Sequence, residues 1–196
     1  MFTGIIETTG KVEQIHPNEK NLDVWISSPI SNALKIDQSI AHNGVCLTVT
    51  DLQEGKHAVT AIHETLQKSN LGSLQVGEHI NLERCMPADG RFDGHIVQGH
   101  VDQTGRITSR TDDAGSWIFR IQYDPAQGNL TVEKGSITVN GVSLTVVDAQ
   151  KDAFSVAIIP YTLEHTVFKY LDEGSVVNLE FDIVGKYIAR LLNKQG

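Results

Sequence analysis

The sequence predicts an all-β protein in which two tandem antiparallel barrels are followed by a single C-terminal α-helix. Three observations carry this prediction: an internal repeat that spans nearly the whole chain, short β-type segments in each copy, and one helical segment that has no counterpart in the first copy. The repeat is the strongest of the three, because it fixes the number and order of the units before any single element is assigned.

The repeat is visible in an eleven-residue segment that occurs at 39–49 and again at 136–146, with eight identical positions. The same offset of 97 residues relates 81–83 to 178–180, and an offset of 95 relates Gly4 to Gly99. Matching blocks in the same order, with one two-residue slip, are not expected by chance. The two halves are therefore copies of one structural unit.

Each copy contains four segments with strand character, rich in β-branched and apolar residues and bounded by Gly, Asn and Asp. Asn-Gly pairs within the longest segments, at 43–44 and 140–141, indicate sharp turns, because both residue types tolerate positive φ. Short strands at this spacing are typical of a small antiparallel barrel. The expected strands are 23–28, 39–51, 57–62 and 79–83 in the first copy, and 117–123, 136–148, 153–159 and 176–181 in the second.

The remaining segments complete the organisation of the chain. Short helical turns are expected at 65–71 and 162–168, and the Pro, Gly and Asp residues at 86–94 indicate a linker. In 184–193 the apolar residues follow a helical spacing, which predicts an amphipathic helix that must pack on the barrels or on another subunit. We divide the chain into an N-terminal barrel (1–88), a C-terminal barrel (98–184) and a terminal helix (185–196).

Composition restricts the classes of partner. The formal net charge of −8 argues against nucleic acid and anionic membrane surfaces, whose binding depends on Lys and Arg. The chain has two cysteines, no signal-peptide pattern at its start and no apolar run of the roughly 18 residues that a membrane span needs. We therefore expect a reduced, soluble, cytoplasmic protein with no nucleic-acid or membrane partner.

The positions where the two copies differ are candidates for chemistry. Cys46 stands opposite Ser143, His100 opposite Ile5, Lys134 opposite Asp37, and Asp182 opposite Cys85. Each has a structural explanation: a core cysteine, a satisfied polar histidine, a solvated lysine, a helix-capping aspartate. Together, as breaks in a repeated pattern, they indicate a small-molecule site that has become asymmetric.

A metal or nucleotide site is not expected. His95 and His100 are five residues apart in an extended segment, so their side chains should point to opposite faces. No cysteine or carboxylate cluster accompanies them, and none of the glycine-rich phosphate motifs or nucleophile elbows is present.

The chain resembles the riboflavin synthases of the α-chain type over essentially its whole length. Six motifs in order carry the resemblance: Met1-Phe2-Thr3-Gly4-Ile5-Ile6-Glu7, Asn43-Gly44-Val45-Cys46-Leu47-Thr48-Val49, Gly94-His95-Ile96-Val97-Gln98-Gly99-His100-Val101-Asp102, Gly141-Val142-Ser143-Leu144-Thr145-Val146, Ile159-Pro160-Tyr161-Thr162-Leu163-Glu164-His165-Thr166 and Gly185-Lys186-Tyr187. The resemblance implies six strands in Greek-key order for each barrel.

The resemblance also implies a reaction. Two molecules of 6,7-dimethyl-8-ribityllumazine exchange a four-carbon unit, giving riboflavin and 5-amino-6-ribitylaminouracil, the last step of riboflavin biosynthesis, without metal or organic cofactor. Members of the family are homotrimers joined by their C-terminal helices, with each site between two subunits. Only the resemblance to the family suggests lumazine synthase as a partner. The duplication then makes sense, because two identical substrates need two similar pockets.

The resemblance assigns substrate contacts to both copies. In the N-terminal barrel it places them at Gly4, Ile5, Ile6, Cys46, Leu47, Thr48, Thr60, Ala61, Ile62, His63, Glu64 and Thr65. In the C-terminal barrel it places them at Gly99, His100, Val101, Lys134, Ser143, Leu144, Thr145, Ile159, Pro160, Tyr161, Thr162, Leu163 and Glu164, with Asp182 and Lys134 binding the ribityl chain or the ring.

Five residues are expected to serve the chemistry. His100 is the proton relay, Ser143 and Thr145 are hydrogen-bonding partners, and Cys46 and Ser39 position the second substrate. Two positions depart from the family pattern: Asn140 stands where many members carry Asp, and Tyr161 where His or Glu is common. A charged role at Asn140 is therefore not expected.

Two other functions are compatible with a duplicated barrel. Lumazine proteins of luminous bacteria are similar two-barrel monomers that hold one flavin-like chromophore and catalyse nothing. A structural or protein-interaction module is the second alternative, and it leaves Cys46, His100 and Lys134 unexplained. Retention of a fluorescent chromophore without riboflavin formation would identify the first alternative.

Overall fold

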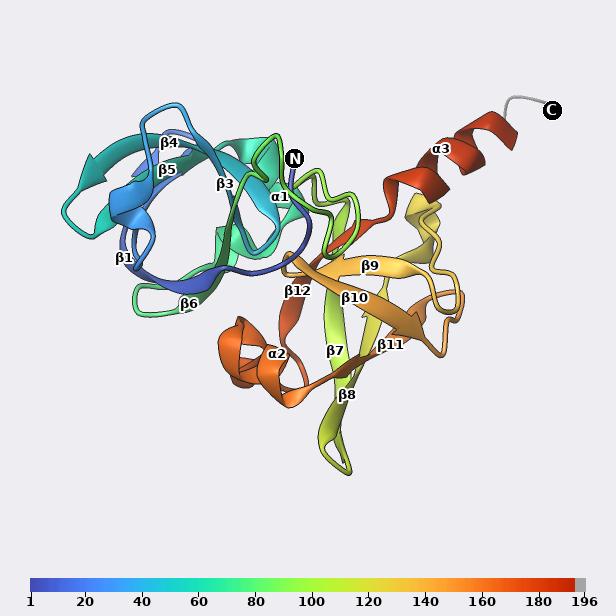
Figure 1. Ribbon diagram of the computed structural model, residues 1–196. Helices are drawn as coiled ribbons and strands as arrows, with labels where there is room; N and C mark the ends of the chain where they lie inside the picture. Colours follow the sequence, from blue (N-terminus) through green and yellow to red (C-terminus); the bar gives the residue numbers. More distant parts are fainter. Residues whose placement is uncertain (193–196) are drawn as a thin grey trace.

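The computed structural model describes residues 1–192, in which two closed six-stranded antiparallel barrels lie beside each other and a helix extends from the second (Figure 1). The N-terminal barrel has the strand order β1-β2-β5-β4-β3-β6 and the C-terminal barrel the order β10-β11-β8-β7-β12-β9. The predicted fold class, a tandem duplication of antiparallel barrels followed by a helix, is confirmed.

The strands of the N-terminal barrel are β1 (Thr8–Asn18), β2 (Asn21–Ser27), β3 (Ser39–His42), β4 (Val45–Gln53), β5 (Lys56–Ala61) and β6 (His79–Arg84). Those of the C-terminal barrel are β7 (Gln103–Asp113), β8 (Ser116–Tyr123), β9 (Ser136–Val139), β10 (Val142–Val147), β11 (Ala153–Ile158) and β12 (Val176–Phe181). Every strand that the sequence predicts is present, and each of the two longest predicted segments is divided into two strands by its Asn-Gly turn.

The first strand of each barrel, β1 and β7, is not among the strands expected from residue patterns. Each has eleven residues, but its second half extends beyond the barrel and is largely exposed, so buried positions recur only near its start. That leaves too short an alternating pattern to be recognised in the sequence.

Helical segments follow the same repeat. α1 (His63–Lys68) and the 3₁₀ turn η2 (Asn70–Ser73) correspond to α2 (Pro160–His165) and η4 (Val167–Tyr170), which agrees with the predicted helical turns. Two further 3₁₀ turns are η1 (Ser31–Ala33) and η3 (Pro125–Gln127). No helix of the described chain is long and apolar enough to span a membrane.

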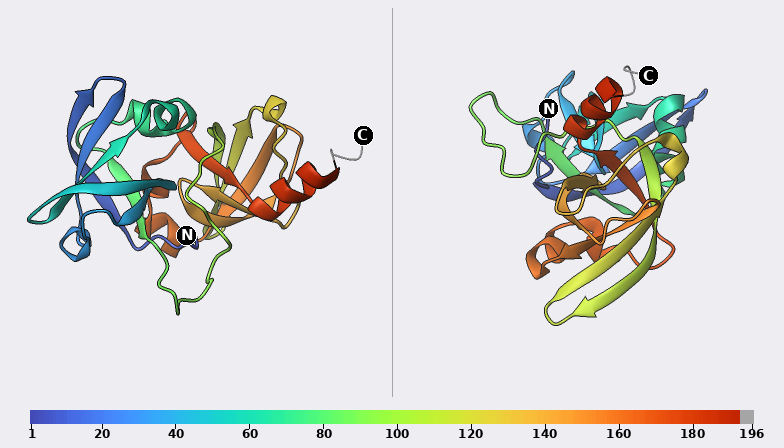
Figure 2. Two further views of the ribbon diagram at one scale, coloured as in Figure 1. Left: turned by 90° about the horizontal axis from the view of Figure 1, so that it is seen from above. Right: turned by 90° about the vertical axis from the view of Figure 1, so that its right-hand side faces the viewer.

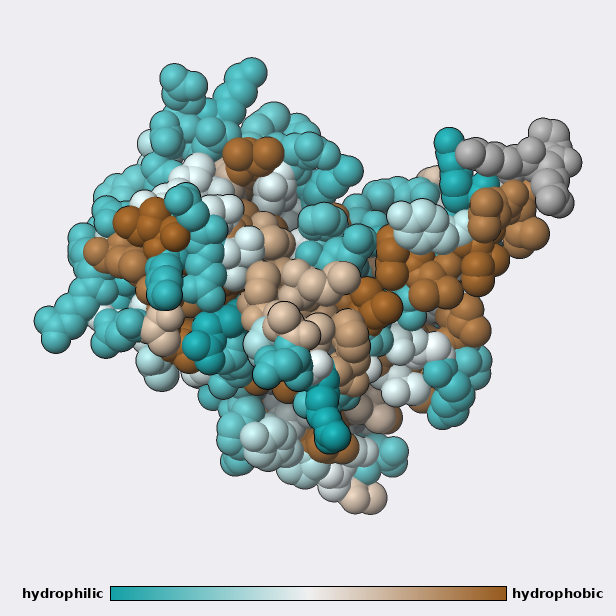
Figure 3. Space-filling model, turned by 45° about the horizontal axis from the view of Figure 1, so that its top comes forward, coloured by the Kyte–Doolittle hydropathy of each residue, from teal (hydrophilic) through white to brown (hydrophobic). Residues whose placement is uncertain are grey.

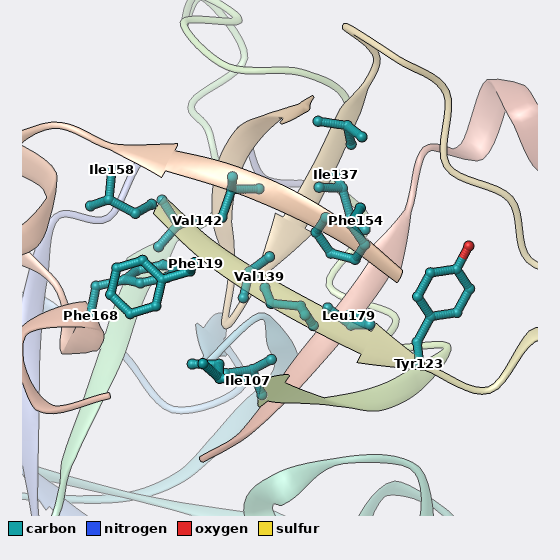
Figure 4. Close-up of a cluster of buried hydrophobic side chains, with 14 of the residues drawn as sticks. Ile107, Phe119, Tyr123, Ile137, Val139, Val142, Phe154, Ile158, Phe168 and Leu179 are labelled. Atoms are coloured by element: carbon teal, nitrogen blue, oxygen red, sulfur yellow. The ribbon is translucent and has the colours of Figure 1, made fainter. Parts of the chain in front are cut away.

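Each barrel encloses its own hydrophobic core. In the C-terminal barrel Phe119 and Phe168 meet edge to face with ring centroids 5.1 Å apart, and further aromatic side chains, Tyr123 and Phe154 among them, fill the interior together with aliphatic ones (Figure 4). The N-terminal core is built mainly from Val, Ile and Leu. It differs in containing a polar chain, because the buried side chains of His42 and His57 form a hydrogen bond of 2.9 Å between their Nε2 atoms.

The two barrels meet at their equivalent Asn-Gly turns. Asn43 and Gly44 have φ values of 46° and 80°, and Asn140 and Gly141 have 47° and 80°, as expected for two-residue hairpin turns of type I′. A Cβ atom added to Gly44 would lie 2.7 Å from the backbone nitrogen of Gly141, and one added to Gly141 would lie 2.7 Å from that of Gly44. Glycine is therefore required by conformation and by contact together.

Asparagines complete this barrel–barrel contact reciprocally. The Asn81 side-chain amide donates to the Asn140 carbonyl oxygen, and the Asn178 amide donates to that of Asn43, both at 2.9 Å. Asn140 Oδ1 accepts the Asn178 backbone N–H at 2.8 Å, so this departure from the family pattern has a satisfied structural role. These groups are buried, and their paired hydrogen bonds fix how the barrels sit against each other.

The terminal helix α3 (Ile183–Leu192) projects from the C-terminal barrel, and the connection between β6 and β7 forms a long protruding loop (Figure 2). Ile188, Leu191 and Leu192 are 53–67% exposed, and apolar side chains gather along the helix (Figure 3). The predicted amphipathic helix is confirmed up to Leu192; Asn193, its expected last residue, lies outside the described part of the chain.

Candidate functional site

Two equivalent segments, residues 2–6 before β1 and residues 97–101 before β7, pass between the barrels. We call them the first and second crossing segments. They pair with each other, because the Phe2 N–H donates to the Val97 carbonyl at 2.8 Å and the Val97 N–H donates to that of Phe2 at 3.2 Å. The Phe2 side chain is fully buried beside Ala41 and Val97.

Each crossing segment contacts the barrel that its own strand does not belong to. The Gly99 carbonyl accepts the Cys46 N–H at 2.8 Å, and Val101 packs against the N-terminal core. Conversely, the Gly4 carbonyl accepts the Ser143 N–H at 2.8 Å, and Ile6 packs against the C-terminal core. The sequence analysis grouped 4–6 with the N-terminal barrel and 99–101 with the C-terminal barrel, whereas the structure places each segment against the other barrel. The two segments are exchanged.

The exchange places His100 and Cys46 in the wall of one cavity. This cavity, the N-pocket, has a volume of about 630 Å³, which is within the range of small-molecule binding sites. Of the residues expected in the site, seven line it: Cys46, Ile62, Glu64, Thr65, Gly99, His100 and Val101. His100 and Ile62 are exposed to solvent at its mouth.

Cys46 lies on β4 with its thiol half-buried. Burial raises the pKa of this thiol, and the neighbouring Ser39 hydroxyl lowers it by a smaller amount. The group is therefore protonated at neutral pH and is suited to polar contact with a ligand rather than to nucleophilic attack.

The opposite side of the N-pocket carries an ion pair. Lys186 of α3 contacts Asp102, with its Nζ atom 2.7 Å from Oδ1 and 2.6 Å from Oδ2, and Asp102 Oδ2 also accepts the Phe181 N–H at 2.9 Å. Both residues are in the pocket wall, so the terminal helix is attached directly to the site.

Ser143, the counterpart of Cys46, has a different neighbour. Its hydroxyl is 2.7 Å from His95 Nδ1, and the linker backbone at Gly94 passes so close that an added Cβ would be 2.9 Å from the Ser143 Cβ. Burial lowers the pKa of His95, while the charge of Asp182 raises it by less. His95 thus points towards Ser143, whereas His100 lines the N-pocket, in agreement with the expected opposite orientation.

Other expected residues take structural positions. Asp182 Oδ1 accepts the Val184 N–H at 2.9 Å and so caps α3. Lys134 is exposed in the turn before β9, where it and its counterpart Asp37 both have positive φ. Thr48 and Thr145, equivalent on β4 and β10, are both exposed.

The remaining residues expected in the site lie either in or against a barrel core or on the surface. Thr60 donates to Asp23 at 2.6 Å, while Ala61 and Leu47 belong to the N-terminal core. In the C-terminal barrel, Leu144 and Leu163 pack against the core and Thr162 is half-buried, whereas Tyr161 is exposed and stacks on His165. His63, Ile159, Pro160 and Glu164 are also exposed, as is Ile5, the counterpart of His100.

The N-pocket also contains residues that sequence reasoning missed: Val45, Lys68, Ser69, Asp102, Gln127, Asn129 and Lys186. Asp102 and Lys186 lie within motifs that resemble the family, so these motifs could have identified them as candidate site residues. Gln127 and Asn129 come from a loop of the C-terminal barrel, and no repeat position marks them.

Comparison with known proteins agrees with the duplication. The lumazine binding domain family matches twice, at residues 3–85 and 98–182. The riboflavin synthase of Actinobacillus pleuropneumoniae is 45% identical, with 100% of this chain and 91% of that protein covered. The Bacillus subtilis riboflavin synthase is 42% identical over 99% of this chain and 91% of its own length, and the Saccharomyces cerevisiae enzyme is 37% identical over 97% and 85%.

Solved structures with the same fold include those of LumP. The complex of LumP with 6,7-dimethyl-8-(1'-D-ribityl) lumazine superposes with a TM-score of 0.84 at 21% identity, covering 92% of this chain and 98% of LumP. The riboflavin complex gives 0.85 at 22% identity, with 93% and 100% covered. These likenesses establish the fold. The double domain match and the relatives of 37–45% identity along nearly the full chain show that the chain belongs to the riboflavin synthase family.

Proposed function

We propose that this chain is a riboflavin synthase that converts two molecules of 6,7-dimethyl-8-ribityllumazine into riboflavin and 5-amino-6-ribitylaminouracil. The observation that carries the proposal is the reciprocal exchange of the crossing segments, which gives the equivalent residues Cys46 and Ser143 the same backbone contact but different side-chain neighbours. Family membership supports the same reaction. A dismutation needs this arrangement, since two identical molecules must bind alike and react differently.

In the N-pocket, His100 would transfer protons to and from the bound lumazine. An imidazole is the side chain most often used for this purpose. Cys46, which stays a thiol because burial raises its pKa, would contact the ring without forming a bond to it. Ser39 acts through Cys46, because its hydroxyl influences the thiol directly.

The ribityl chain carries several hydroxyl groups and therefore needs polar partners. Glu64, Lys68, Asp102 and Lys186 line the N-pocket and supply both hydrogen-bond donors and acceptors. We assign the ribityl chain to this charged side and the ring to the side formed by Cys46 and Val101.

The second ligand position would be formed by the C-terminal barrel and the first crossing segment. There the Ser143 hydroxyl, held beside His95, and the exposed Ile5 replace the thiol and imidazole of the N-pocket. Ile5 has no group that can transfer a proton, and the imidazole at this position, that of His95, is hydrogen-bonded to the Ser143 hydroxyl. This difference supports an unequal division of roles between the two bound molecules.

We propose a homotrimer assembled through α3. The exposed apolar side chains of Ile188, Leu191 and Leu192 would lose solvent contact there, and the ion pair of Lys186 with Asp102 would connect the helix to the site. The N-pocket of one subunit would then face the Ser143 position of its neighbour. A cytoplasmic location and association with lumazine synthase belong to the same proposal.

The reaction is tested with purified protein and synthetic 6,7-dimethyl-8-ribityllumazine. Riboflavin should form at a ratio of one molecule for every two lumazines consumed, as measured by liquid chromatography with fluorescence detection. A protein that binds lumazine tightly but yields no riboflavin would instead be a lumazine-binding protein, and the proposal of catalysis would be abandoned.

A further inference from the structure

Buried carboxylates hold both crossing segments. Glu180, on β12 and 4% exposed, accepts the backbone N–H groups of Gln98 at 2.7 Å, of Gly99 at 2.9 Å and of His100 at 2.9 Å. Three consecutive peptide groups thus point at one carboxylate. An ionised carboxylate has acceptor sites for all of them and no hydrogen to oppose them.

Glu83 occupies the equivalent position on β6, 97 residues earlier, and does the same for the first crossing segment. Its Oε1 accepts the Thr3 N–H at 2.7 Å and the Thr3 hydroxyl at 3.0 Å, and its Oε2 accepts the Gly4 N–H at 3.1 Å. The repeated arrangement indicates that holding the segment is a property of the original unit.

The second crossing segment carries a reactive group, whereas the first does not. Glu180 fixes the peptide planes on both sides of Gly99, whose carbonyl then meets the Cys46 N–H, and the next side chain is His100 in the N-pocket wall. The N-terminal barrel contributes one backbone hydrogen bond, from the Cys46 N–H to Gly99, and the apolar packing of Val101, whereas Glu180 holds three consecutive N–H groups, that of His100 included. The position of His100 therefore depends on a strand of the opposite barrel.

We propose that Glu180 is a positioning residue for His100, so that the C-terminal barrel sets the geometry of proton transfer in the N-pocket. This inference rests on the proposed function. Glu180 does not line the pocket and acts through the backbone of the second crossing segment. Glu83 positions Gly4 and Ile5 in the corresponding way, but no proton-transferring side chain follows it.

Glu180→Gln tests the inference with little change of shape. The glutamine amide offers one oxygen and places N–H donors where an acceptor is needed, so at least one of the three backbone groups loses its partner. We expect kcat to fall by about tenfold to a hundredfold, the effect of losing one charged hydrogen bond. KM should change by less, because the lining residues remain.

A purely structural role would lower activity too, so the decisive measurement is a double-mutant cycle with His100→Gln. If Glu180 acts through His100, Glu180→Gln should reduce kcat less than about threefold when His100 is already absent. The matched control is Glu83→Gln, whose effect should multiply with that of His100→Gln. Equal effects of Glu180→Gln with and without His100 would overturn the inference.

Thermal unfolding is measured first for every variant. If Glu180→Gln is unfolded, Glu180→Asp replaces it in the cycle, since it keeps the charge but shortens the reach to the three N–H groups. Wild-type protein without riboflavin formation would refute the proposed function instead. The environment of the His100 ring, followed by the NMR signal of its Cε1–H group, would then decide the inference: it should change in Glu180→Gln and stay unchanged in Glu83→Gln, and an unchanged signal in Glu180→Gln would overturn it.

Discussion

The buried histidine pair in the N-terminal barrel predicts a specific loss of stability in mild acid. His42 and His57 are 1% and 0% exposed, and His57 Nδ1 is 2.9 Å from the Ser31 hydroxyl, which is 2.8 Å from that of Ser28. Burial lowers the pKa of His57 to about 4. Burial and the neighbouring ring lower the pKa of His42 well below its usual range. Both rings are therefore neutral in the folded protein at pH 7.

The direction in which stability changes with pH follows from proton linkage. Between pH 6.5 and 4 the unfolded chain protonates His57 while the folded barrel does not, so stability is complete above pH 6.5 and is lost as the pH falls. For one group with these two pKa values the loss is roughly 2 kcal/mol at pH 5 and about 3 kcal/mol below pH 4. His42 acts in the same direction. Glu83 and Glu180, whose pKa values burial raises, act in the opposite direction.

A variant without the histidine pair can be designed from the residues at the equivalent positions of the C-terminal barrel. Val139 and Phe154 occupy the positions equivalent to His42 and His57, and both are fully buried. We expect the double variant His42→Val/His57→Phe to be as stable as the parent within about 1–2 kcal/mol at pH 7.5, because the two rings that bond each other are removed together and Ser31 keeps its hydrogen bond to Ser28. It should lose less stability than the parent at pH 5, by about 2 kcal/mol or more. Both proteins keep Glu83 and Glu180, so the difference isolates the histidines.

The assay is urea unfolding at pH 7.5 and pH 5.0, followed by the fluorescence of Trp25 on β2 in a Trp117→Phe background, so that the signal comes from the N-terminal barrel. His57→Phe alone is the control, since it leaves His42 Nε2 buried without a partner and should cost about 1–3 kcal/mol at both pH values. If parent and double variant lose stability in parallel within about 0.5 kcal/mol, the reasoning about the buried pair is wrong.

Three further predictions concern the site and its assembly. His100→Gln should reduce kcat by roughly 10²-fold with little change in the riboflavin dissociation constant, and unchanged turnover would remove His100 from the proposed chemistry. Ile188→Glu/Leu191→Glu should yield inactive monomers in analytical ultracentrifugation, while Arg190→Glu, which changes the charge by the same amount, should not; active monomers would exclude a shared site. Gly44→Ala should destabilise the protein by more than the about 1–3 kcal/mol that a positive φ alone costs, because the added Cβ would also meet Gly141. The control is Gly55→Ala, which has a φ of 70° but no atom within 4 Å of the added Cβ and should therefore show only the cost of the positive φ. Equal thermal shifts for the two glycine variants would contradict the close contact of the barrels.

Deleting residues 186–196 would test the role of the terminal helix less cleanly, because the deletion has two effects. The structure places Lys186 against Asp102 in the N-pocket, so the deletion removes a pocket residue together with the apolar surface. The charge-matched substitutions farther along α3 leave Lys186 in place. They therefore separate assembly from the composition of the site.

Much of the fold follows from the sequence because a duplication doubles every signal. The Asn-Gly turns and most strands can be located from residue patterns alone, since the pattern at one position of a barrel is supported by its counterpart 97 residues away. The terminal helix has no counterpart and is located by its own helical spacing of apolar residues. The strands β1 and β7 escape because long exposed ends dilute their buried positions. Duplication cannot correct this weakness, because both copies share it.

The site is predicted less completely, for a different physical reason. Repeat alignment identifies which residues are equivalent, but it does not say which barrel a connecting segment contacts, so it cannot reveal the exchange of 4–6 and 99–101. Comparing mismatched positions also hides residues that both copies need. Glu83 and Glu180 are identical, and their importance becomes visible only in the hydrogen bonds that they accept.

The close contact at Gly44 and Gly141 determines where this protein tolerates added sequence. Hairpin tips usually accept insertions, but the β3–β4 and β9–β10 tips touch each other, so any lengthening would force the barrels apart. The tips at Gly55, between β4 and β5, and at Gly115, between β7 and β8, have no atom within 4 Å of an added Cβ. A peptide tag or a labelled cysteine intended to report on the working enzyme belongs at those two tips.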